Sequence, residues 1–434
     1  MIAPRSSGPL YPAPRAPTGP ARRDPAGGGH GGRMPTAPAT RLGRALQDRG
    51  LVRPPSLQTD GTRTASRLEL FFDLAFVLVV AELASSLRSD VTVSGALRFT
   101  GLFTVVWWAW MSSTLYANRF DHDDVLFRLN KLAAMLAVVG LAAGASDATG
   151  KYATAWILSY VALRVLLLLQ YLRAHRHVEQ ARTGIRFYLA GTGTGAVLWT
   201  ASLAVEGTPR YVLWALGVLV DALAPLLVTA ASVQVPLHLE HLPERFSLFV
   251  ILVLGESVAA VAHGVHDASW TAGAVVTGAV AFVLAAALWW SFFDLAGAAA
   301  KHLLDEAGDT GTTSAHDVFV YGQLPLTLSL AVVGVGVQGI VLESTAESSV
   351  GVRTLLAGGV ALYLVTVAVT NAGMAQRARS GWWWAGLAAA FAVGDALLEM
   401  PALAVVGGLA VLMCVVVAVG ADQSARGRVQ LAEI

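Results

Sequence analysis

Residues 68–87 read LELFFDLAFVLVVAELASSL, a run in which three carboxylates are the charged side chains. About 20 apolar residues in a helix are needed to cross the hydrocarbon core of a bilayer. The apolar residues are continuous rather than alternating, which favours a helix over a strand of an outer-membrane barrel. The stretch therefore predicts a membrane-spanning helix that contains acids in need of an explanation.

The pattern of this stretch recurs along the chain, because apolar runs of similar length alternate with short polar breaks. Each run is long enough for one crossing of the bilayer. The predicted spans are 68–87, 97–117, 127–146, 152–172, 185–205, 211–231, 246–263, 271–293, 319–342, 352–372, 382–399 and 402–420. The fold class predicted from them is an all-α, polytopic integral membrane protein with about twelve transmembrane helices.

The overall composition excludes other classes of protein. The 434 residues are 55% hydrophobic and 14% charged, with a mean hydropathy of +0.59. A soluble protein has roughly 45–50% apolar and about 25% charged residues. Nucleic acid is not an expected partner, because no basic face exists outside the first 66 residues. Cys414 is the single cysteine, which excludes an intrachain disulfide and a cysteine-based metal site.

Residues 1–66 differ from the rest of the chain. They hold ten arginines against three aspartates, and eleven of the 17 prolines. Such a stretch cannot bury enough apolar surface to offset its ordering entropy, so we predict a disordered cytoplasmic tail. It also lacks the apolar region of a signal peptide.

The basic residues predict the orientation of the spans. With the amino terminus in the cytoplasm, the cytoplasmic tails and loops, together with the span ends next to them, collect 24 of the 30 Lys and Arg residues, and the opposite loops and span ends collect five. This split is what the positive-inside rule expects. The sequence therefore predicts a protein of the inner (plasma) membrane with both termini in the cytoplasm and with the lipid bilayer as a partner.

Short matches between the two parts of the chain suggest an internal duplication. Arg67 and Phe71 open the first span, and Arg245 and Phe249 open the seventh at the same spacing. Tryptophan pairs, His-Asp pairs and Val-Val-Gly triplets recur in the same order. The predicted division is a first half at 67–232, a second half at 245–420 and a tail at 421–434. Parallel repeats of this kind recur in transporters and can also form channels.

Ionisable residues inside the predicted spans are the candidates for function. Such a residue costs a few kcal/mol on insertion scales, so it usually faces a partner or a cavity. Glu69 and Asp73 are four apart and share one helix face, whereas Glu82 lies near the other end of that span and is expected to be solvated. A carboxylate in a cavity can bind a cation or carry a proton.

Three further charges belong to this set. Arg164 lies centrally in its span and needs an anion, for which Asp73 and Glu256 are the candidates. Glu256 follows Gly255, which permits close approach or a local break. Asp221 lies four residues before Pro225, so the carbonyl of residue 221 loses its helical donor. The alternative is that all of these charges are structural pairs between helices.

Two other patterns have plainer interpretations. His238 and His241 have a spacing that can bind a metal, but no third ligand is evident, and no cofactor is predicted. The glycines of residues 191–195 match a small-xxx-small pattern and indicate close helix packing rather than a phosphate loop. The tryptophans at 107–108, 289–290 and 382–384 fit either interfacial belts or helix packing.

Two segments resemble a known family. RLELFFDLAFV at 67–77 and HLPERFSLFVILVLGE at 241–256 are similar to signatures of the bacterial low temperature requirement A family of multi-pass membrane proteins. Ala75 stands where family members usually have valine. The residues that carry the resemblance are Arg67, Glu69, Phe71, Phe72, Asp73, His241, Glu244, Arg245, Gly255 and Glu256. The resemblance implies a membrane location and a helical fold, and it implies no particular reaction.

A fainter resemblance concerns the opening of the first span. Arg67, Phe71 and Asp73 are similar to the Arg-x-x-x-Phe-Ser-Asp motif of the lysosomal potassium-channel family, with Phe72 in place of the serine. The second half keeps Arg245 and Phe249 but has Ile251 where the acid would be. This match suggests an ion channel.

The leading functional hypothesis is movement of an unidentified small solute or ion, with or without proton coupling. Asp73 and Glu256 are the expected cation or proton sites, and Arg164 is the expected counter-charge. A structural or sensory protein of the cold or envelope stress response is the alternative, and it predicts tightly paired charges in a closed core. An enzyme acting on lipid or envelope precursors is not expected, because the short outer loops offer no cluster of catalytic residues.

Overall fold

The computed structural model describes residues 51–57, 66–121, 123–230, 242–296, 313–344, 348–375, 382–398 and 400–432. Most of the predicted tail and the segment with His238 and His241 lie outside these ranges. Within them the chain forms twelve α-helices, each coinciding with one predicted apolar run. The helices are α2 (Arg67–Ser89), α3 (Val93–Arg119), α4 (Val125–Gly144), α5 (Ala153–His177), α6 (Arg182–Ala201), α7 (Thr208–Ala230), α8 (Leu242–Asp267), α9 (Ala272–Trp290), α11 (Thr313–Leu342), α12 (Val350–Ala375), α13 (Trp382–Leu398) and α14 (Ala402–Ala432).

Short elements connect or extend these helices. Two-residue strands β1 (Ser56–Leu57) and β2 (Phe120–Asp121) pair antiparallel. A π-helical turn, η4 (Ser291–Ala296), continues α9. Single 3-10 turns are η1 (Ala145–Asp147), η2 (Glu179–Ala181) and η3 (Ser202–Ala204).

Nine helices of the described chain are long and apolar enough to cross a membrane, namely α2, α4, α5, α7, α8, α9, α11, α12 and α14. The protein is therefore a multi-span helical membrane protein. Helix α13 has only 17 residues, and α3 and α6 are long enough but less apolar. The twelve helices are thus observed, whereas the count of twelve crossings stays a prediction.

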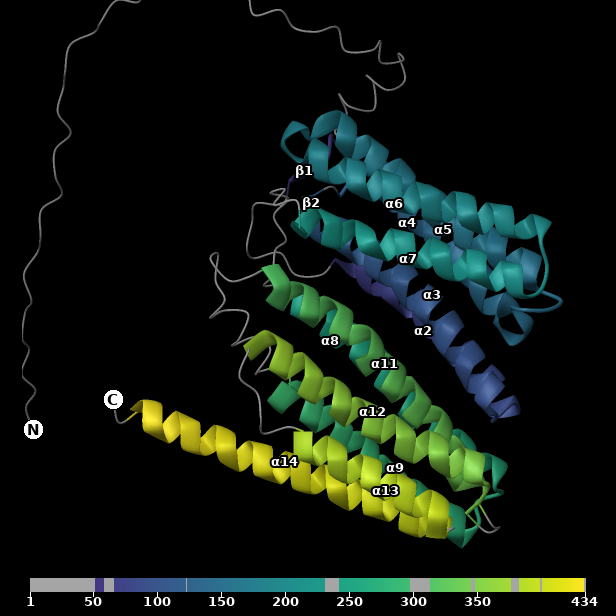
Figure 1. The fold of residues 1–434 in the computed structure, drawn as a ribbon, viewed down its shortest axis with the longest axis vertical. Helices are drawn as coiled ribbons and strands as arrows, with labels where there is room; N and C mark the ends of the chain where they lie inside the picture. The colour runs from purple at the N-terminus through teal and green to yellow at the C-terminus, as the bar shows by residue number, and fades with distance from the viewer. Residues whose placement is uncertain are drawn as a thin grey trace, which may run out of the picture.

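The helices lie side by side in two groups (Figure 1). Helices α2–α7 form the first group, and α8, α9 and α11–α14 form the second group. Helix α2 contacts α8 and α11 across the boundary, and α3 also contacts α11. These four helices join the groups, so residues on them can connect the two parts of the molecule.

Local sequence fixes the start of α2. The Ser66 hydroxyl accepts a hydrogen bond from the Glu69 N–H at 3.2 Å, and the Glu69 carboxylate accepts one from the Ser66 N–H at 3.3 Å. This reciprocal capping box satisfies two backbone donors that a helix start leaves free. It also holds the Glu69 side chain at the beginning of the helix, beside the boundary between the groups.

Packing between helices accounts for two patterns of the sequence, the first tryptophan pair and the glycines of α6. Trp107 and Trp108 are buried, so this pair serves helix packing, whereas Trp289 and Trp290 are about half exposed. A Cβ on Gly195 would lie 2.9 Å from the backbone of α7, and one on Gly191 would lie 2.8 Å from Ala224. The glycines of α6 therefore allow the close α6–α7 approach that was predicted.

Candidate functional site

A buried cluster of charges joins α2 to α8. Arg245 donates from Nη1 to Glu69 Oε2 and from Nη2 to Asp73 Oδ1, both at 2.9 Å. All three side chains are at most 7% exposed. Glu69 and Asp73 act together because their four-residue spacing places both on one helix face, as predicted. Arg245 lies in the first turns of α8, so the ion pairs connect the two groups near the beginnings of these helices.

Asp73 is only half satisfied in this cluster. Its Oδ1 also accepts a hydrogen bond from Trp110 Nε1 at 2.8 Å. Its Oδ2 is buried and has no hydrogen-bond partner. Trp110 in turn stacks on Phe249 of α8, with the ring centroids 4.3 Å apart. An unpartnered buried carboxylate oxygen is costly, so its presence marks a place where a proton, a cation or a water can bind.

Lys131 of α4 completes the cluster and was not singled out from the sequence. It is 2% exposed, and its ammonium lies 4.1 Å from the ring centroid of Phe72. It interacts electrostatically with Arg245, Glu69 and Asp73. We call Glu69, Asp73, Lys131 and Arg245 the interface cluster; its formal charges sum to zero. The sequence could have indicated Lys131, because this lysine lies four residues into a predicted span.

A second buried cluster lies inside the first group. Arg164 Nη1 of α5 donates to Asp221 Oδ2 of α7 at 2.7 Å. The same oxygen accepts from Trp108 Nε1 at 2.9 Å, and Asp221 Oδ1 accepts from Thr192 Oγ1 at 2.6 Å. Arg164 Nη1 also donates to Ser112 Oγ at 2.8 Å. We call Trp108, Ser112, Arg164, Thr192 and Asp221 the bundle cluster.

The bundle cluster corrects one prediction. The counter-charge of Arg164 is Asp221, not Asp73 or Glu256. The sequence placed Arg164 and Asp221 correctly inside their spans, but separation along the chain does not reveal which spans pack together. Both oxygens of Asp221 have donors, and both residues of the ion pair are at most 3% exposed. This arrangement is that of a structural pair, which was the alternative interpretation.

Asp221 also borders a very small cavity. The cavity measures about 10 Å³, and its polar lining includes Tyr171, Tyr188, Thr192 and Asp221. That volume is at the lower limit for one water molecule. The cavity is too small for any larger solute, so this part of the first group is closed.

Glu256 forms a looser contact at the other end of α2. Arg88 Nη1 lies 3.4 Å from Glu256 Oε1, and the two side chains are 22% and 11% exposed. The expected local break or close approach at Gly255 is wrong, because α8 is continuous there and a Cβ on Gly255 would meet nothing within 4 Å. Glu82 is exposed, as expected for a solvated side chain.

Outside the predicted spans, Asp124 forms a third aspartate–arginine pair. Asp124 caps α4 by accepting from the Phe127 N–H at 2.9 Å, and it pairs with Arg173 of α5. Burial alone would raise the pKa of Asp124. The hydrogen bonds from Arg173 and from the backbone of Phe127 and Arg53 outweigh burial and hold this pKa below its usual value. This pair ties α4 to α5 at the end of the bundle.

A comparison with known protein families matches residues 64–419 to the family described as bacterial low temperature requirement A protein (LtrA). This range covers most of the chain and includes both buried clusters. The chain belongs to the LtrA family. A relative from Rhizobium meliloti (strain 1021), described as uncharacterized protein RA0937, is 28% identical over 288 residues. The match covers 64% of this chain and 69% of that protein, and no solved structure matches.

The two LtrA-like segments meet in the fold. The first segment supplies Glu69 and Asp73, and the second supplies Arg245, so the two segments contact each other at the boundary between the groups. Phe72 is buried beneath Lys131, whereas Arg67 and Phe71 are exposed. Glu244 lies in the first turn of α8, and His241 lies outside the described residues.

The described residues contain no group of three histidine, cysteine, aspartate or glutamate side chains placed to hold a metal ion. The side chains that sequence reasoning missed include Lys131, Trp110, Ser112, Thr192 and Arg88. Tryptophan and threonine inside an apolar run give no signal of their own. Arg88 was counted as a loop residue, although its guanidinium reaches the carboxylate of Glu256.

Proposed function

We propose that this LtrA-family protein moves a small solute or ion across the membrane by relative movement of two six-helix halves. The halves are α2–α7 and α8–α14. Asp73 is the proposed cation- or proton-binding carboxylate, and the chain performs no covalent chemistry in this account. The observation that carries the proposal is the interface cluster, which joins the halves and leaves Asp73 Oδ2 without a partner.

Equivalent packing in the two groups supports the duplication. In each group the first helix packs against the second and third, the third against the fourth, and the fourth against the fifth. The second helix also contacts the sixth in both groups. Repeats that share one orientation place a binding site between them near the membrane midplane in known transporter folds.

Two ion pairs at different depths connect α2 to α8. The first is the Arg245 pair with Glu69 and Asp73, and the second is Arg88 with Glu256. Asp73 and Arg88 are separated by about 22 Å along α2 at 1.5 Å per residue. In this proposal the two pairs keep the halves closed, and alternating opening of the pairs would expose the α2–α8 contact first to one side of the membrane and then to the other.

Proton binding by Asp73 offers a way to control the first of these pairs, that of Arg245 with Glu69 and Asp73. Protonation of Asp73 leaves Arg245 paired with Glu69 alone and gives the interface cluster a net positive charge. Because a buried uncompensated charge is strongly unfavourable, the protonated cluster favours separation of α2 from α8. Proton uptake and movement of the halves are coupled in this way.

The side of the membrane on which each ion pair lies follows from the orientation proposed for the chain. We place both termini in the cytoplasm of a bacterial cell because basic residues concentrate on that side. The interface cluster then lies toward the cytoplasm, and the Arg88–Glu256 pair lies toward the outside of the inner membrane.

The proposal is tested with purified protein in proteoliposomes. A trapped pH-sensitive dye reports proton flux, and Na⁺, K⁺ and small organic solutes are supplied one at a time in a gradient. We expect flux for at least one of them, a strong loss in Asp73→Asn, and a partial loss in Glu256→Gln. Glu82→Gln is the matched control, because it neutralises an exposed carboxylate on the same helix as Asp73.

The outcome that contradicts the assigned roles is unchanged flux in both Asp73→Asn and Glu256→Gln. Thermal unfolding of each variant in detergent separates loss of transport from loss of fold. Flux that saturates with solute concentration indicates a carrier, and flux that stays linear up to high concentration indicates a channel.

A second candidate function is a structural or sensory role in the membrane. The bundle cluster favours it, because Asp221 has donors on both oxygens, pairs with buried Arg164 and lies beside a cavity of only about 10 Å³, as expected for a closed core. This account expects no flux of any solute. It also expects the Asp73→Asn and Glu82→Gln variants to behave alike in cold-growth assays.

A further inference from the structure

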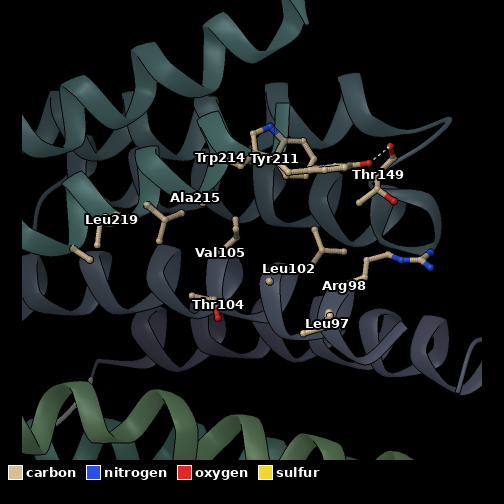
Figure 2. Close-up of a pocket in the computed structure, with 13 residues that line it drawn as sticks. Leu97, Arg98, Leu102, Thr104, Val105, Thr149, Tyr211, Trp214, Ala215 and Leu219 are labelled. Carbon is tan, nitrogen blue, oxygen red and sulfur yellow. Dashed lines mark hydrogen bonds between the residues drawn. The ribbon is translucent and has the colours of Figure 1, made fainter. Parts of the chain in front are cut away.

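An apolar groove lies between α3 and α7, and no residue of either buried cluster lines it (Figure 2). Its volume is about 670 Å³, which falls in the range of small-molecule sites. Leu102 and Val105 of α3 and Ala215, Val218 and Leu219 of α7 form its walls. Since α7 is one of the helices fit to span the membrane, the groove opens at a depth where lipid is the solvent.

The polar groups along the groove are engaged with neighbouring protein atoms. The Thr104 hydroxyl donates to the Thr100 carbonyl at 2.8 Å. Trp214 Nε1 donates to Ser202 Oγ at 2.9 Å, and the Tyr211 hydroxyl donates to the Thr149 carbonyl at 3.4 Å. These side chains present their methyl groups and ring faces to the groove. Such a surface gains free energy from an apolar occupant and offers few hydrogen bonds to a polar solute.

One end of the groove carries a cation. Arg98, Tyr211 and Thr149 lie together at this end, and Leu219 lies at the other end (Figure 2). Arg98 Nη2 contacts Asp90 Oδ2 at 2.6 Å, and the Arg98 side chain stays 39% exposed. A guanidinium has five N–H donors, so one contact to Asp90 leaves donors for a second anion. An aromatic residue and an arginine at one end of an apolar slot match the headgroup region of a lipid.

We propose that this groove binds one acyl chain of a membrane phospholipid, with the phosphate of that lipid held by Arg98. An anionic phospholipid such as phosphatidylglycerol combines a negatively charged headgroup with a long hydrocarbon chain, which matches the arginine at one end of the groove and the apolar walls along it. The site is independent of the interface cluster, so its test does not depend on transport.

A glycine in the groove provides a clean way to block it. Gly101 lies in the lining, and a Cβ built on it would meet no atom within 4 Å. Position 101 therefore has room for a Cβ, and we expect a leucine there to extend into the groove. Gly358 of α12 is the matched control, because its Cβ would also meet nothing within 4 Å and it lies in the other group of helices.

The experiment uses full-length protein in vesicles that contain a phosphatidylglycerol with a photoreactive group in its acyl chain. After irradiation, mass spectrometry of peptides locates the adducts. We expect adducts at Val218 and Leu219 that unlabelled phosphatidylglycerol displaces at low mole fraction. Labelling at Leu136, a side chain of α4 that is 73% exposed, serves as the reference for ordinary lipid contact.

Gly101→Leu should reduce groove labelling to the reference level, and Gly358→Leu should leave it unchanged. Arg98→Gln should remove the advantage of phosphatidylglycerol over phosphatidylcholine as competitor. Gly101→Ala is the milder variant if leucine impairs folding, and it should weaken labelling by an intermediate amount. The proposal is overturned if groove and reference positions compete identically in every variant, or if the crosslinks join two copies of the protein.

Discussion

The interface cluster and the bundle cluster each contain a buried arginine with an aspartate, yet they differ in how fully the carboxylate is satisfied. In the bundle cluster, three donors reach the two oxygens of Asp221. In the interface cluster, two donors share one oxygen of Asp73, and the other oxygen has none. The first cluster connects helices of one group to each other, whereas the second joins the two groups, and we propose that protonation of Asp73 weakens this second contact.

Location in the fold adds to this difference. Arg164 and Asp221 lie on α5 and α7, which belong to the same group, and the glycines of α6 bring α6 close to α7 beside them. Asp73 and Arg245 lie on helices that meet at the boundary between the groups (Figure 1). The carboxylate with donors on both oxygens lies within one group, whereas the carboxylate at the boundary has one oxygen without a donor, and we propose that the boundary contact is the one that moves. The following predictions test this contrast.

The largest effect is expected from breaking the bundle cluster. Asp221→Leu leaves Arg164 buried without an anion, and removal of one partner of such a pair costs about 3–5 kcal/mol of stability. We expect a large fall in the unfolding temperature in detergent and poor recovery of monodisperse protein on size-exclusion chromatography. A double variant, Arg164→Met with Asp221→Leu, should recover much of the loss because no charge remains. Wild-type stability in the single variant would refute the structural role.

A smaller loss of stability is expected from Asp73→Asn in the interface cluster. The asparagine oxygen can still accept from Trp110, and Arg245 retains Glu69, so we expect a cost of about 1–2 kcal/mol. Transport in proteoliposomes should fall much more than stability does. The contrast fails if Asp73→Asn destabilises the protein as strongly as Asp221→Leu.

Lys131 tests whether the interface cluster behaves as one charge-balanced unit. Lys131→Met leaves two carboxylates with one arginine and removes a cation–π contact of about 0.5–2 kcal/mol. Combined with Asp73→Asn, it restores charge balance. We therefore expect the double variant to be more stable than the sum of the single effects predicts, with a coupling of about 1 kcal/mol in a double-mutant cycle. Strict additivity would show that Lys131 acts separately from Asp73.

The smallest effect is expected at the pair of Asp124 with Arg173, which lies outside the predicted spans. Asp124→Asn keeps the helix cap but loses the ion pair, at a cost of about 1 kcal/mol at neutral pH. The folded-state pKa of Asp124 is lowered, so its contribution is complete above the unfolded pKa of about 3.9 and is lost as pH falls through the folded value. Unfolding temperatures measured at several pH values should converge for wild type and variant in acid. A difference that persists unchanged at the lowest pH would contradict this account.

Much of the fold was predictable because hydrophobic length is a local property. Each apolar run became one helix, and the four-residue spacing of Glu69 and Asp73 predicted their shared face correctly. The pairing of charges was not predictable from one sequence. The partner of Arg164 depends on the α5–α7 arrangement, and that arrangement rests on contacts between residues far apart in the chain.

The polar roles of some uncharged residues could not be predicted from the sequence for a related reason. Trp110 and Thr192 occur in apolar or small-residue stretches where they resemble packing residues, and only their distances to Asp73 and Asp221 reveal a polar role. Gly255 led to a prediction of a feature that is absent. A glycine beside an acid suggested a local break in the helix, but α8 is continuous at this position.

The most direct test of the central claim is a pair of distance measurements by electron spin resonance in a Cys414→Ser background. One pair of spin labels replaces exposed Leu78 of α2 and Val258 of α8, and the other replaces exposed Leu169 of α5 and Leu227 of α7. Asp73→Asn imitates the protonated carboxyl group. The account predicts that this substitution shifts or broadens the α2–α8 distance distribution and leaves the α5–α7 distribution unchanged. An unchanged α2–α8 distribution, or an equal change in both, would contradict it.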